Sequence, residues 1–151
     1  HYVLSVTISN DLIEDFTALQ KLLPKKEVTV VIKDLFKAMK NKDAELAKSV
    51  FGQNARLTTV ATKEGKSVLK EEKIAKFIDF IGTPSDNIYD ERILDYEVKI
   101  DGDMATVWTP YEFYLNDKFL HCGVNAFQLF KGEKGWKILQ ITDTRRKKDC
   151  K

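Results

Sequence analysis

Apolar residues recur at two different periods along the chain, and the change of period divides it into a helical first part and a β-rich second part. Residues 28–39 carry apolar side chains at helical spacing, with lysines and an aspartate on the opposite side. Residues 11–23 indicate a weaker helix that Pro24 ends, because proline has no backbone N–H to donate. Asp43 is suited to cap a further short helix that runs through Phe51.

The pattern changes in the middle of the chain. Residues 55–62 are rich in Thr and Val and predict a strand, whereas residues 70–81 return to helical spacing. Four longer strands follow, and Asp101-Gly102 between the first two is a strong hairpin signal. These strands are Tyr89–Ile100, Met104–Leu115, Phe119–Phe130 and Trp136–Asp143. We therefore expect an α+β domain, in which a curved antiparallel sheet wraps around the N-terminal helices and leaves a cone-shaped interior.

Composition fits one folded domain over residues 1–151 and argues against two classes of partner. Hydrophobic residues make up 43% and charged residues 32%, a balance that is too apolar for a disordered chain. The net charge is only +2, with lysines and glutamates mixed along the chain, so no nucleic-acid partner is expected. No run of about 18 apolar residues occurs, so no membrane partner is expected either. The basic cluster at residues 145–148 is typical of a solvated tail, with a clamp for an anionic ligand as the alternative.

Two cysteines, Cys122 and Cys150, leave the redox compartment open. Their spacing does not suggest zinc, and no metal-ligand pattern or glycine-rich phosphate loop occurs, so no metal or cofactor is expected. A disulfide between the two cysteines can form in principle, but nothing in the sequence requires it. The chain begins at His1 and not with methionine, so it could be cytoplasmic, or exported after removal of a signal peptide.

Side chains alternate between the two faces of a strand, and this alternation relates the second and third long strands. If the turn between them is symmetric, Phe119 lies opposite Leu115 and His121 lies opposite Phe113. Both faces of the third strand are largely apolar, so both are expected to be covered, one by the helices and the other by a partner chain.

The last hairpin would bring further polar residues to the same face. If it centres on Glu133, Asp143 lies opposite Gly123 and Arg145 lies opposite His121. A slip of one residue in either hairpin would scatter the group. The candidate catalytic residues are His121 and Asp143, and the candidate ligand-binding residues are Tyr111, Phe113, Asn125 and Arg145.

Such a group would suit proton abstraction next to a carbonyl, or a dehydration. His121 titrates near neutral pH, and Asp143 could orient its imidazole or take a proton itself. Tyr111 could donate a hydrogen bond to a developing oxyanion, and Arg145 could hold a carboxylate or phosphate. A structural interpretation stands beside each role: a hydrogen-bonded histidine, an aspartate paired with arginine, and aromatic side chains that pack in the sheet.

The element order and the β-rich part resemble the nuclear transport factor 2-like superfamily. The resemblance lies in YEFY (111–114), HCGVNAFQL (121–129), GWKI (135–138) and DTRR (143–146). More narrowly, the chain is similar to the bacterial lumazine-binding subgroup, close to SnoaL-like proteins. The match covers roughly residues 25–146, while residues 1–23 have no matching feature and could be an extra helix. The resemblance implies a cone-shaped, cystatin-like α+β fold that is often a dimer through the sheet.

Three functions compete on this evidence. The first is binding of a small apolar or aromatic molecule in the cone cavity, which needs no complete catalytic set. The second is an isomerase, dehydratase or cyclase that uses His121 and Asp143, by analogy with enzymes of this superfamily. The third is a homodimeric interaction module without catalysis. It rests on the apolar outer face of the third strand, which carries Cys122, Val124, Ala126 and Phe130.

Overall fold

The computed structural model describes residues 9–150, and within this range it contains three helices and seven strands. The helices are α1 (Asn10–Asn41), α2 (Ala44–Val50) and α3 (Ile74–Gly82). The strands are β1 (Phe51–Lys63), β2 (Lys66–Glu72), β3 (Tyr89–Ile93), β4 (Glu97–Asp101), β5 (Met104–Leu115), β6 (Lys118–Gly132) and β7 (Gly135–Thr144). The predicted α+β class is confirmed. Of the predicted extension, residues from Asn10 onward belong to α1, and residues 1–8 lie outside the described range.

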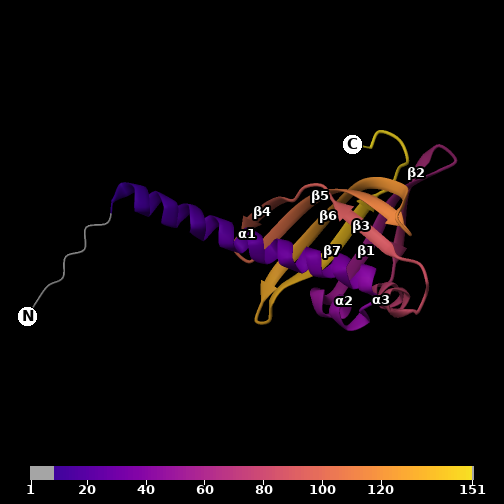
Figure 1. Cartoon of the computed structure of the whole chain (residues 1–151), viewed down its shortest axis with the longest axis horizontal. Coiled ribbons are helices and arrows are strands. Elements are labelled where there is room, and N and C mark those ends of the chain that lie inside the picture. The colour runs from indigo at the N-terminus through magenta and orange to yellow at the C-terminus, as the bar shows by residue number, and fades with distance from the viewer. Residues whose placement is uncertain (1–8, 151) are drawn as a thin grey trace, which may run out of the picture.

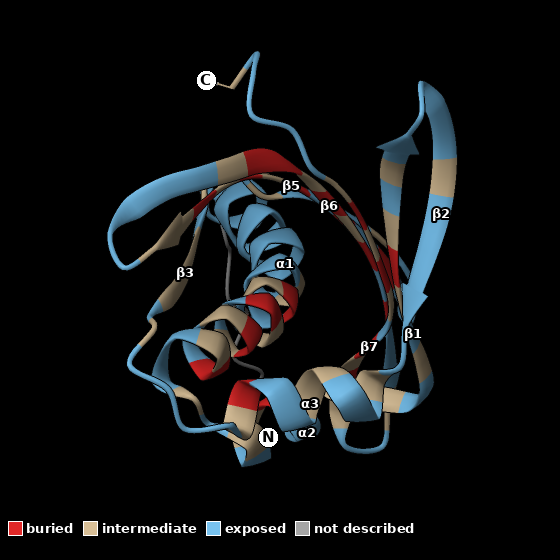
Figure 2. Cartoon of the chain, turned by 90° about the vertical axis from the view of Figure 1, so that its right-hand side faces the viewer, coloured by how far each residue is buried: buried red, intermediate tan, exposed pale blue. Residues whose placement is uncertain are grey.

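The strands form one strongly curved, open sheet (Figure 1). Its order is β2-β1-β7-β6-β5-β3, and β4 pairs with the other half of the free edge of β5. Every pair of neighbouring strands is antiparallel except β1 with β7, which is parallel. That pair departs from the predicted antiparallel sheet. β1 lies next to β7 at the edge of the meander, although α3 and strands β2 to β6 separate the two along the chain. Figure 2 shows the sheet curving around α1, with buried residues both in the strands and in the part of the helix that they surround.

α1 continues through Pro24, where the sequence predicted an end, so that prediction is wrong. The Ser9 hydroxyl accepts a hydrogen bond from the N–H of Leu12 at 3.3 Å and caps the start of α1, and Lys42 ends it in the left-handed conformation with φ 56°. A proline removes one helical hydrogen bond and favours a bend, but it does not stop a helix whose two flanks both favour helical structure. The N-terminal half of α1 projects beyond the sheet (Figure 1). Within the described residues, no helix is both long and apolar enough to cross a membrane.

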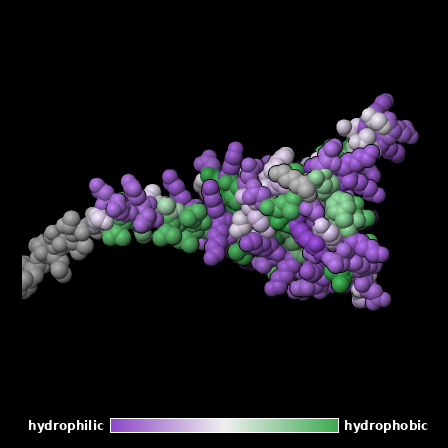
Figure 3. Space-filling model, turned by 45° about the horizontal axis from the view of Figure 1, so that its top comes forward, coloured by the Kyte–Doolittle hydropathy of each residue, from purple (hydrophilic) through white to green (hydrophobic). Residues whose placement is uncertain are grey.

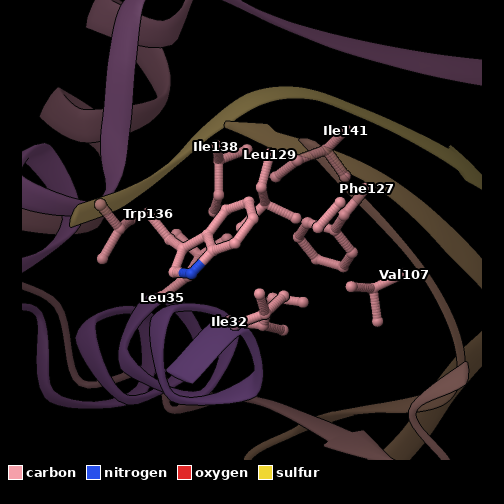
Figure 4. Packing of buried hydrophobic residues seen from close by; sticks show 11 residues of the cluster. Ile32, Leu35, Val107, Phe127, Leu129, Trp136, Ile138 and Ile141 are labelled. Atoms are coloured by element: carbon pink, nitrogen blue, oxygen red, sulfur yellow. The ribbon is translucent and has the colours of Figure 1, made fainter. Parts of the chain in front are cut away.

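The C-terminal half of α1 packs against one half of the concave face of the sheet. Val28, Ile32 and Leu35, which belong to the predicted apolar stripe, are no more than 1% exposed. Burial of side chains of this kind stabilises a domain by roughly 1.5–3 kcal/mol each. Figure 4 shows Ile32 and Leu35 on the helix facing the strand residues of the same cluster. The other buried members are Val50, Ala105, Val107, Phe127, Leu129, Trp136, Ile138 and Ile141.

The helix predicted at residues 70–81 begins only at Ile74, because the chain before it forms β2. A turn at Glu64-Gly65, with both residues at positive φ, folds β2 back on β1. The pairing of Val60 with Leu69 is part of this hairpin. The hairpin ladder therefore satisfies the backbone groups of the first residues that sequence periodicity assigned to the helix.

The strand predicted over Tyr89–Ile100 is interrupted and becomes β3 and β4. Both pair with β5, but their registers differ by one residue. In the register of β4, an uninterrupted strand would place Glu91 opposite Tyr114, on the outer face of the sheet. In β3 it lies opposite Phe113 instead, on the concave face. The break therefore turns one acidic side chain from the outside to the inside.

The hairpin of β5 and β6 has the predicted register in its interior and a different one near its turn. His121 lies opposite Phe113, as predicted. An irregularity between Phe113 and Tyr114 then shifts the pairing, so that Phe119 lies opposite Tyr114 and not Leu115. This shift turns Phe119 away from the face that it was predicted to share with His121, and Leu120 lines the interior instead. From His121 to Leu129 the predicted faces are unaffected, because the irregularity lies beyond these residues toward the turn.

The hairpin of β6 and β7 brings Asp143 opposite Asn125, two residues away from the predicted pairing with Gly123. Two deviations combine to give this shift. The turn is formed by Glu133-Lys134 and does not centre on Glu133, and Leu139 is an extra residue in β7. Each deviation moves the register by one residue, so the side chains beyond Leu139, including Asp143, return to their predicted face. The residues between the turn and Leu139 are shifted by one residue only, so Ile138 lies on the inner face opposite Leu129.

Cys122 and Cys150 form a disulfide, a pairing that the sequence left open. Cys122 also exchanges two backbone hydrogen bonds of 2.8 Å with Arg146. This pairing is offset by two residues from the predicted one, in which Arg145 faced His121. The segment after β7 is thus fastened to β6 by a backbone bridge and by a covalent bond.

The outer face of the sheet exposes several large apolar side chains. Met104 and Trp108 are more than half exposed, and Phe130 and Leu139 are more than one third exposed. Cys122, which the sequence placed in an interaction face, is buried instead. A homodimer through this face stays a prediction.

Gly123 is required where β6 passes the end of β7. A Cβ atom at this position would overlap the carbonyl oxygen of Thr144. We therefore expect Gly123→Ala to lower the free energy of unfolding by about 2 kcal/mol more than Gly132→Ala, measured by urea denaturation. Gly132 is the matched control, because its nearest neighbour is the ring edge of the partly exposed Phe130, a side chain that can shift, and not backbone. Equal losses in the two variants would contradict the close approach of Thr144.

Candidate functional site

The half of the concave face that α1 leaves uncovered encloses a cavity of about 330 Å³. Such a volume lies at the lower end of the range for small-molecule sites. Its walls come from α1, α3 and strands β1, β2, β3, β5, β6 and β7. The apolar lining residues are Leu35, Phe36, Met39, Leu57, Phe77, Phe80, Tyr89, Phe113, Leu115, Leu120, Phe127 and Ile141. The polar lining residues are Glu72, Glu91, His121, Asn125, Asp143 and Arg145.

Glu91 is the acidic side chain that the break between β3 and β4 turns inward. Its carboxylate accepts a hydrogen bond of 2.7 Å from the side-chain amide of Asn125. Removal from bulk water raises the pKa of Glu91 to about 7, and the negative charge of Asp143 raises it further, although Asn125 and Arg145 oppose the shift. The exposed surface area of Glu91 makes it only half-buried. Its carboxyl is therefore kept from bulk water by the walls of the cavity around it more than by atoms packed directly against it.

Asp143 is held from two sides at the end of β7. The hydroxyl of Thr59 on the parallel strand β1 donates to Oδ1 at 2.5 Å, and Nε of Arg145 donates to Oδ2 at 3.1 Å. The Asp143 side chain is 10% exposed, whereas that of Arg145 is 56% exposed. Arg145 therefore reaches the cavity from its solvent side and shares its charge between Asp143 and any ligand that enters.

His121 is oriented by two aromatic neighbours. Its ring stacks on Phe113, with centroids 4.8 Å apart and planes within 6°. The Tyr111 hydroxyl lies 3.1 Å from Nδ1 of His121 and 2.7 Å from the carbonyl oxygen of Thr144. Burial raises the pKa of Tyr111, so its hydroxyl stays protonated and its one proton goes to the carbonyl, which can only accept.

The hydrogen bond of Tyr111 to Thr144 sets the tautomer of His121. Because the Tyr111 oxygen can then only accept from the imidazole, Nδ1 of His121 carries the proton and Nε2 has a free lone pair. Burial lowers the pKa of His121, and the positive charge of Arg145 lowers it further. The histidine is therefore a neutral side chain in a wall of the cavity, with an acceptor nitrogen.

The structure brings together five of the six predicted site residues. Phe113, His121, Asn125, Asp143 and Arg145 all line the cavity.

Tyr111 differs from its prediction, because its hydroxyl is occupied by the Thr144 carbonyl and by the His121 ring. It supports His121 from behind the cavity wall. The predicted contact between the two catalytic candidates also differs, because Asp143 has Thr59 and Arg145 as hydrogen-bond partners, and His121 has Tyr111.

Sequence reasoning missed Glu91, and also Thr59, the partner of Asp143. Glu91 was hidden by the one-residue difference in register between β3 and β4. Thr59 was hidden because the parallel pairing of β1 with β7 joins segments far apart in the chain. An acidic residue between Tyr89 and Ile93, whose side chains share its face, is the local signal that could have pointed to Glu91.

The arrangement offers an apolar chamber with acids, a neutral base and one cation at its polar end. A ligand oxygen there can accept a hydrogen bond from protonated Glu91 or from Arg145, and a ligand hydroxyl can donate to Asp143 or His121. Within the described residues, no group of three or more His, Cys, Asp and Glu side chains could hold a metal ion.

Comparisons with known proteins identify the fold. No protein-family model matches the chain, and no curated protein matches it either. Among solved structures, a nuclear transport factor 2-like protein with a cystatin-like fold from Novosphingobium aromaticivorans is 14% identical. The match covers 91% of this chain and 92% of that one, with a TM-score of 0.64.

A second similar structure, from Streptomyces avermitilis, is provisionally named a dehydratase of the nuclear transport factor 2-like family. It is 12% identical, the match covers 80% of this chain and 94% of that one, and the TM-score is 0.62. A third, from Methylobacillus flagellatus, is a nuclear transport factor 2-like protein of unknown function. It is 19% identical over 94% of this chain and 98% of that one, with a TM-score of 0.57. Likeness at this identity shows the fold, and the narrower lumazine-binding resemblance stays a prediction.

The raised pKa of Glu91 gives a pH-dependent test of the cavity. Between pH 4.5 and 7 the folded protein holds a proton that the unfolded chain releases, so this group lowers stability as pH rises. Glu91→Gln removes the effect. We expect the melting temperature of Glu91→Gln, relative to that of the parent, to rise by about 4–8 °C between pH 5 and pH 8. This corresponds to roughly 2 kcal/mol of unfolding free energy, which is less than the full pKa shift implies because water in the cavity screens the charge.

The matched control is Glu97→Gln, which changes an exposed carboxylate on β4. Its melting temperature should follow that of the parent at every pH. A difference between Glu91→Gln and the parent that is constant with pH would contradict the position of Glu91 in a poorly solvated cavity.

Proposed function

We propose that this chain, which has the nuclear transport factor 2-like fold, binds a small, largely apolar or aromatic molecule that carries an oxygen at one end. The observation that carries the proposal is the division of the cavity. Aromatic and aliphatic side chains line most of the wall, and the hydrogen-bonding groups gather beside Glu91, Asn125 and Asp143. A small number of placed polar groups in an apolar chamber is the usual form of a small-molecule site.

The aromatic walls favour a flat ligand. Phe113 and His121 are stacked in one wall, and Phe80 and Tyr89 contact each other in another, with ring centroids 5.0 Å apart. Offset or edge contacts between two aromatic rings stabilise binding by more than the burial of their apolar surface alone. The cavity volume limits the occupant to about two fused rings with short substituents.

The polar end favours a neutral hydroxyl or carbonyl group in the ligand. Protonated Glu91 can donate to a carbonyl, and Asn125 supplies an amide beside it. A carboxylate would instead compete with Asp143 for Arg145, and it would lie close to the Glu91 carboxyl. The site therefore selects an uncharged oxygen more readily than an anion.

A second candidate function is proton transfer on a bound ketone, which the pKa of Glu91 specifically favours. A carboxyl with a pKa of about 7 can hold or release a proton at neutral pH, the condition that suits a general acid or base. In this proposal His121 Nε2 or Asp143 removes a proton from the carbon next to the carbonyl, and protonated Glu91 donates a hydrogen bond to the oxygen that becomes negative. Return of a proton to the same or a neighbouring carbon completes an exchange or an isomerisation.

Binding can be tested with 2-naphthol and naphthalene, which differ by one hydroxyl group, by isothermal titration calorimetry. We expect 2-naphthol to bind the parent more tightly than naphthalene does. Asn125→Leu should weaken 2-naphthol at least about fivefold, the effect of one lost hydrogen bond, and should leave naphthalene almost unchanged. Gln128→Leu, on the exposed outer face of the same strand, should bind both compounds like the parent. Failure of both compounds to bind the parent would contradict the proposal.

Proton transfer can be tested separately with 2-tetralone in deuterated buffer, by following loss of the proton signals next to the carbonyl by NMR. We expect exchange above the rate in buffer alone, and a loss of at least tenfold in His121→Gln or Asp143→Asn. An exchange rate equal to that in buffer alone, together with binding of 2-naphthol, would contradict the proposed proton transfer and leave the proposed binding function in place.

A further inference from the structure

The N-terminal half of α1 carries an apolar stripe that its own domain does not cover. Leu12, Phe16, Leu19 and Leu23 follow each other at intervals of four, three and four residues, which places them on one side of the helix. Each is between 55% and 61% exposed. Figure 3 shows hydrophobic side chains along one side of the projecting helix and hydrophilic ones along the other.

The domain cannot bury this stripe by bending α1 onto the sheet. Leu19 precedes the core residue Val28 by nine residues, and nine residues at 100° each turn the two side chains to opposite sides of the helix. Val28 is fully buried against the sheet, so the stripe points away from this core contact, although Leu19 and Leu23 border a groove beside β4. The Ser9 cap and Asp11 in the first turn favour helix from the start of this segment, so the stripe is a preformed surface.

We propose that this stripe binds the same stripe of a second copy of the chain, with the two α1 helices antiparallel. A row of side chains runs beside the stripe and contains Asp11, Asp15, Leu22 and Lys26, at intervals of four, seven and four residues. The row is acidic at one end and basic at the other. Two antiparallel helices that cross beside Leu19 bring Asp11 and Asp15 of each copy to Lys26 of the other, whereas parallel helices would align like charges.

A groove between α1 and β4 gives the partner helix a place to lie. Its surface is apolar with a basic edge, and two members of the stripe border it. The lining residues are Leu19, Leu22, Leu23, Lys25, Lys26, Thr29, Tyr96 and Val98. In the antiparallel arrangement the first turns of the second copy pass along this groove. Those turns carry Leu12 between acidic side chains and therefore match the groove in both hydrophobicity and charge. Two-fold symmetry repeats the contact, so the first turns of each α1 helix lie in the groove of the other copy.

The test is the mass of the chain by sedimentation velocity between 1 and 100 μM. We expect the parent to move from 17.4 kDa toward twice that mass as concentration rises, since the paired segment is short and its dimer weak. Leu19→Glu should raise the dissociation constant at least tenfold, because it puts two charges at the centre of the contact. Thr17→Glu, on the polar side of the helix, should dimerise like the parent. Unchanged thermal unfolding of Leu19→Glu would show that the domain itself is intact.

The antiparallel arrangement is tested by charge exchange. Lys26→Glu alone and Asp11→Lys with Asp15→Lys should each weaken the dimer, and the triple variant should restore it. Three outcomes would overturn the proposal. The first is a parent that stays monomeric at 100 μM, including one that binds only to phosphatidylglycerol vesicles. The second is a dimer that Leu19→Glu leaves intact and Trp108→Glu separates, which would assign the contact to the outer sheet face. The third is a triple variant that dimerises no more tightly than Lys26→Glu or the double aspartate variant.

Discussion

The packing of Val28, Ile32 and Leu35 against one half of the concave sheet is the contact on which the rest of the structure depends. The curved strands are longer than the helix face that can cover them, so each strand has two environments along its length. In β6, Leu129 belongs to the cluster that packs against α1, whereas Asn125 lies farther along the same face and lines the cavity. The cavity is therefore a consequence of how far the helix reaches along the sheet, and the change from apolar to polar inward residues marks where that cover ends.

The polar end of the cavity stays folded because almost every group there has a partner. Asp143 is bonded to Thr59 and Arg145, Asn125 to Glu91, and His121 to Tyr111. Such partners offset the cost of removing polar groups from water, which is otherwise several kcal/mol. Glu91 is the group whose charge is least compensated, which is why its pKa rises. The disulfide of Cys122 with Cys150 fastens the segment that carries Arg145 beside this cluster, and disulfides of this kind persist in oxidising compartments.

The sequence predicted the fold class, the core stripe at residues 28–39 and the shared face of His121 and Asn125, because each depends on a short-range period. It failed where a local signal competes with distant pairing. Proline at position 24 signalled a stop but lies within α1, and residues 70–72 joined a hairpin although their spacing also suits a helix. The position of Glu91 depends on a one-residue change of register, and the Thr59 contact depends on a parallel pair of strands far apart in the chain. The correct face of Asp143 emerged from two shifts that cancel in parity, which strand alternation alone cannot foresee.

The curved sheet encloses a poorly solvated cavity with Glu91 in its wall. The most direct measurement is a pH titration of the side-chain carboxyl carbons of ¹³C-labelled glutamate by NMR, with Glu91→Gln to assign the signal. The account predicts that the Glu91 signal titrates near pH 7, well above the ordinary range for glutamate, and that 2-naphthol displaces its midpoint. Titration of Glu91 below about pH 5, with no response to 2-naphthol, would contradict the account, because it would place this carboxyl in water.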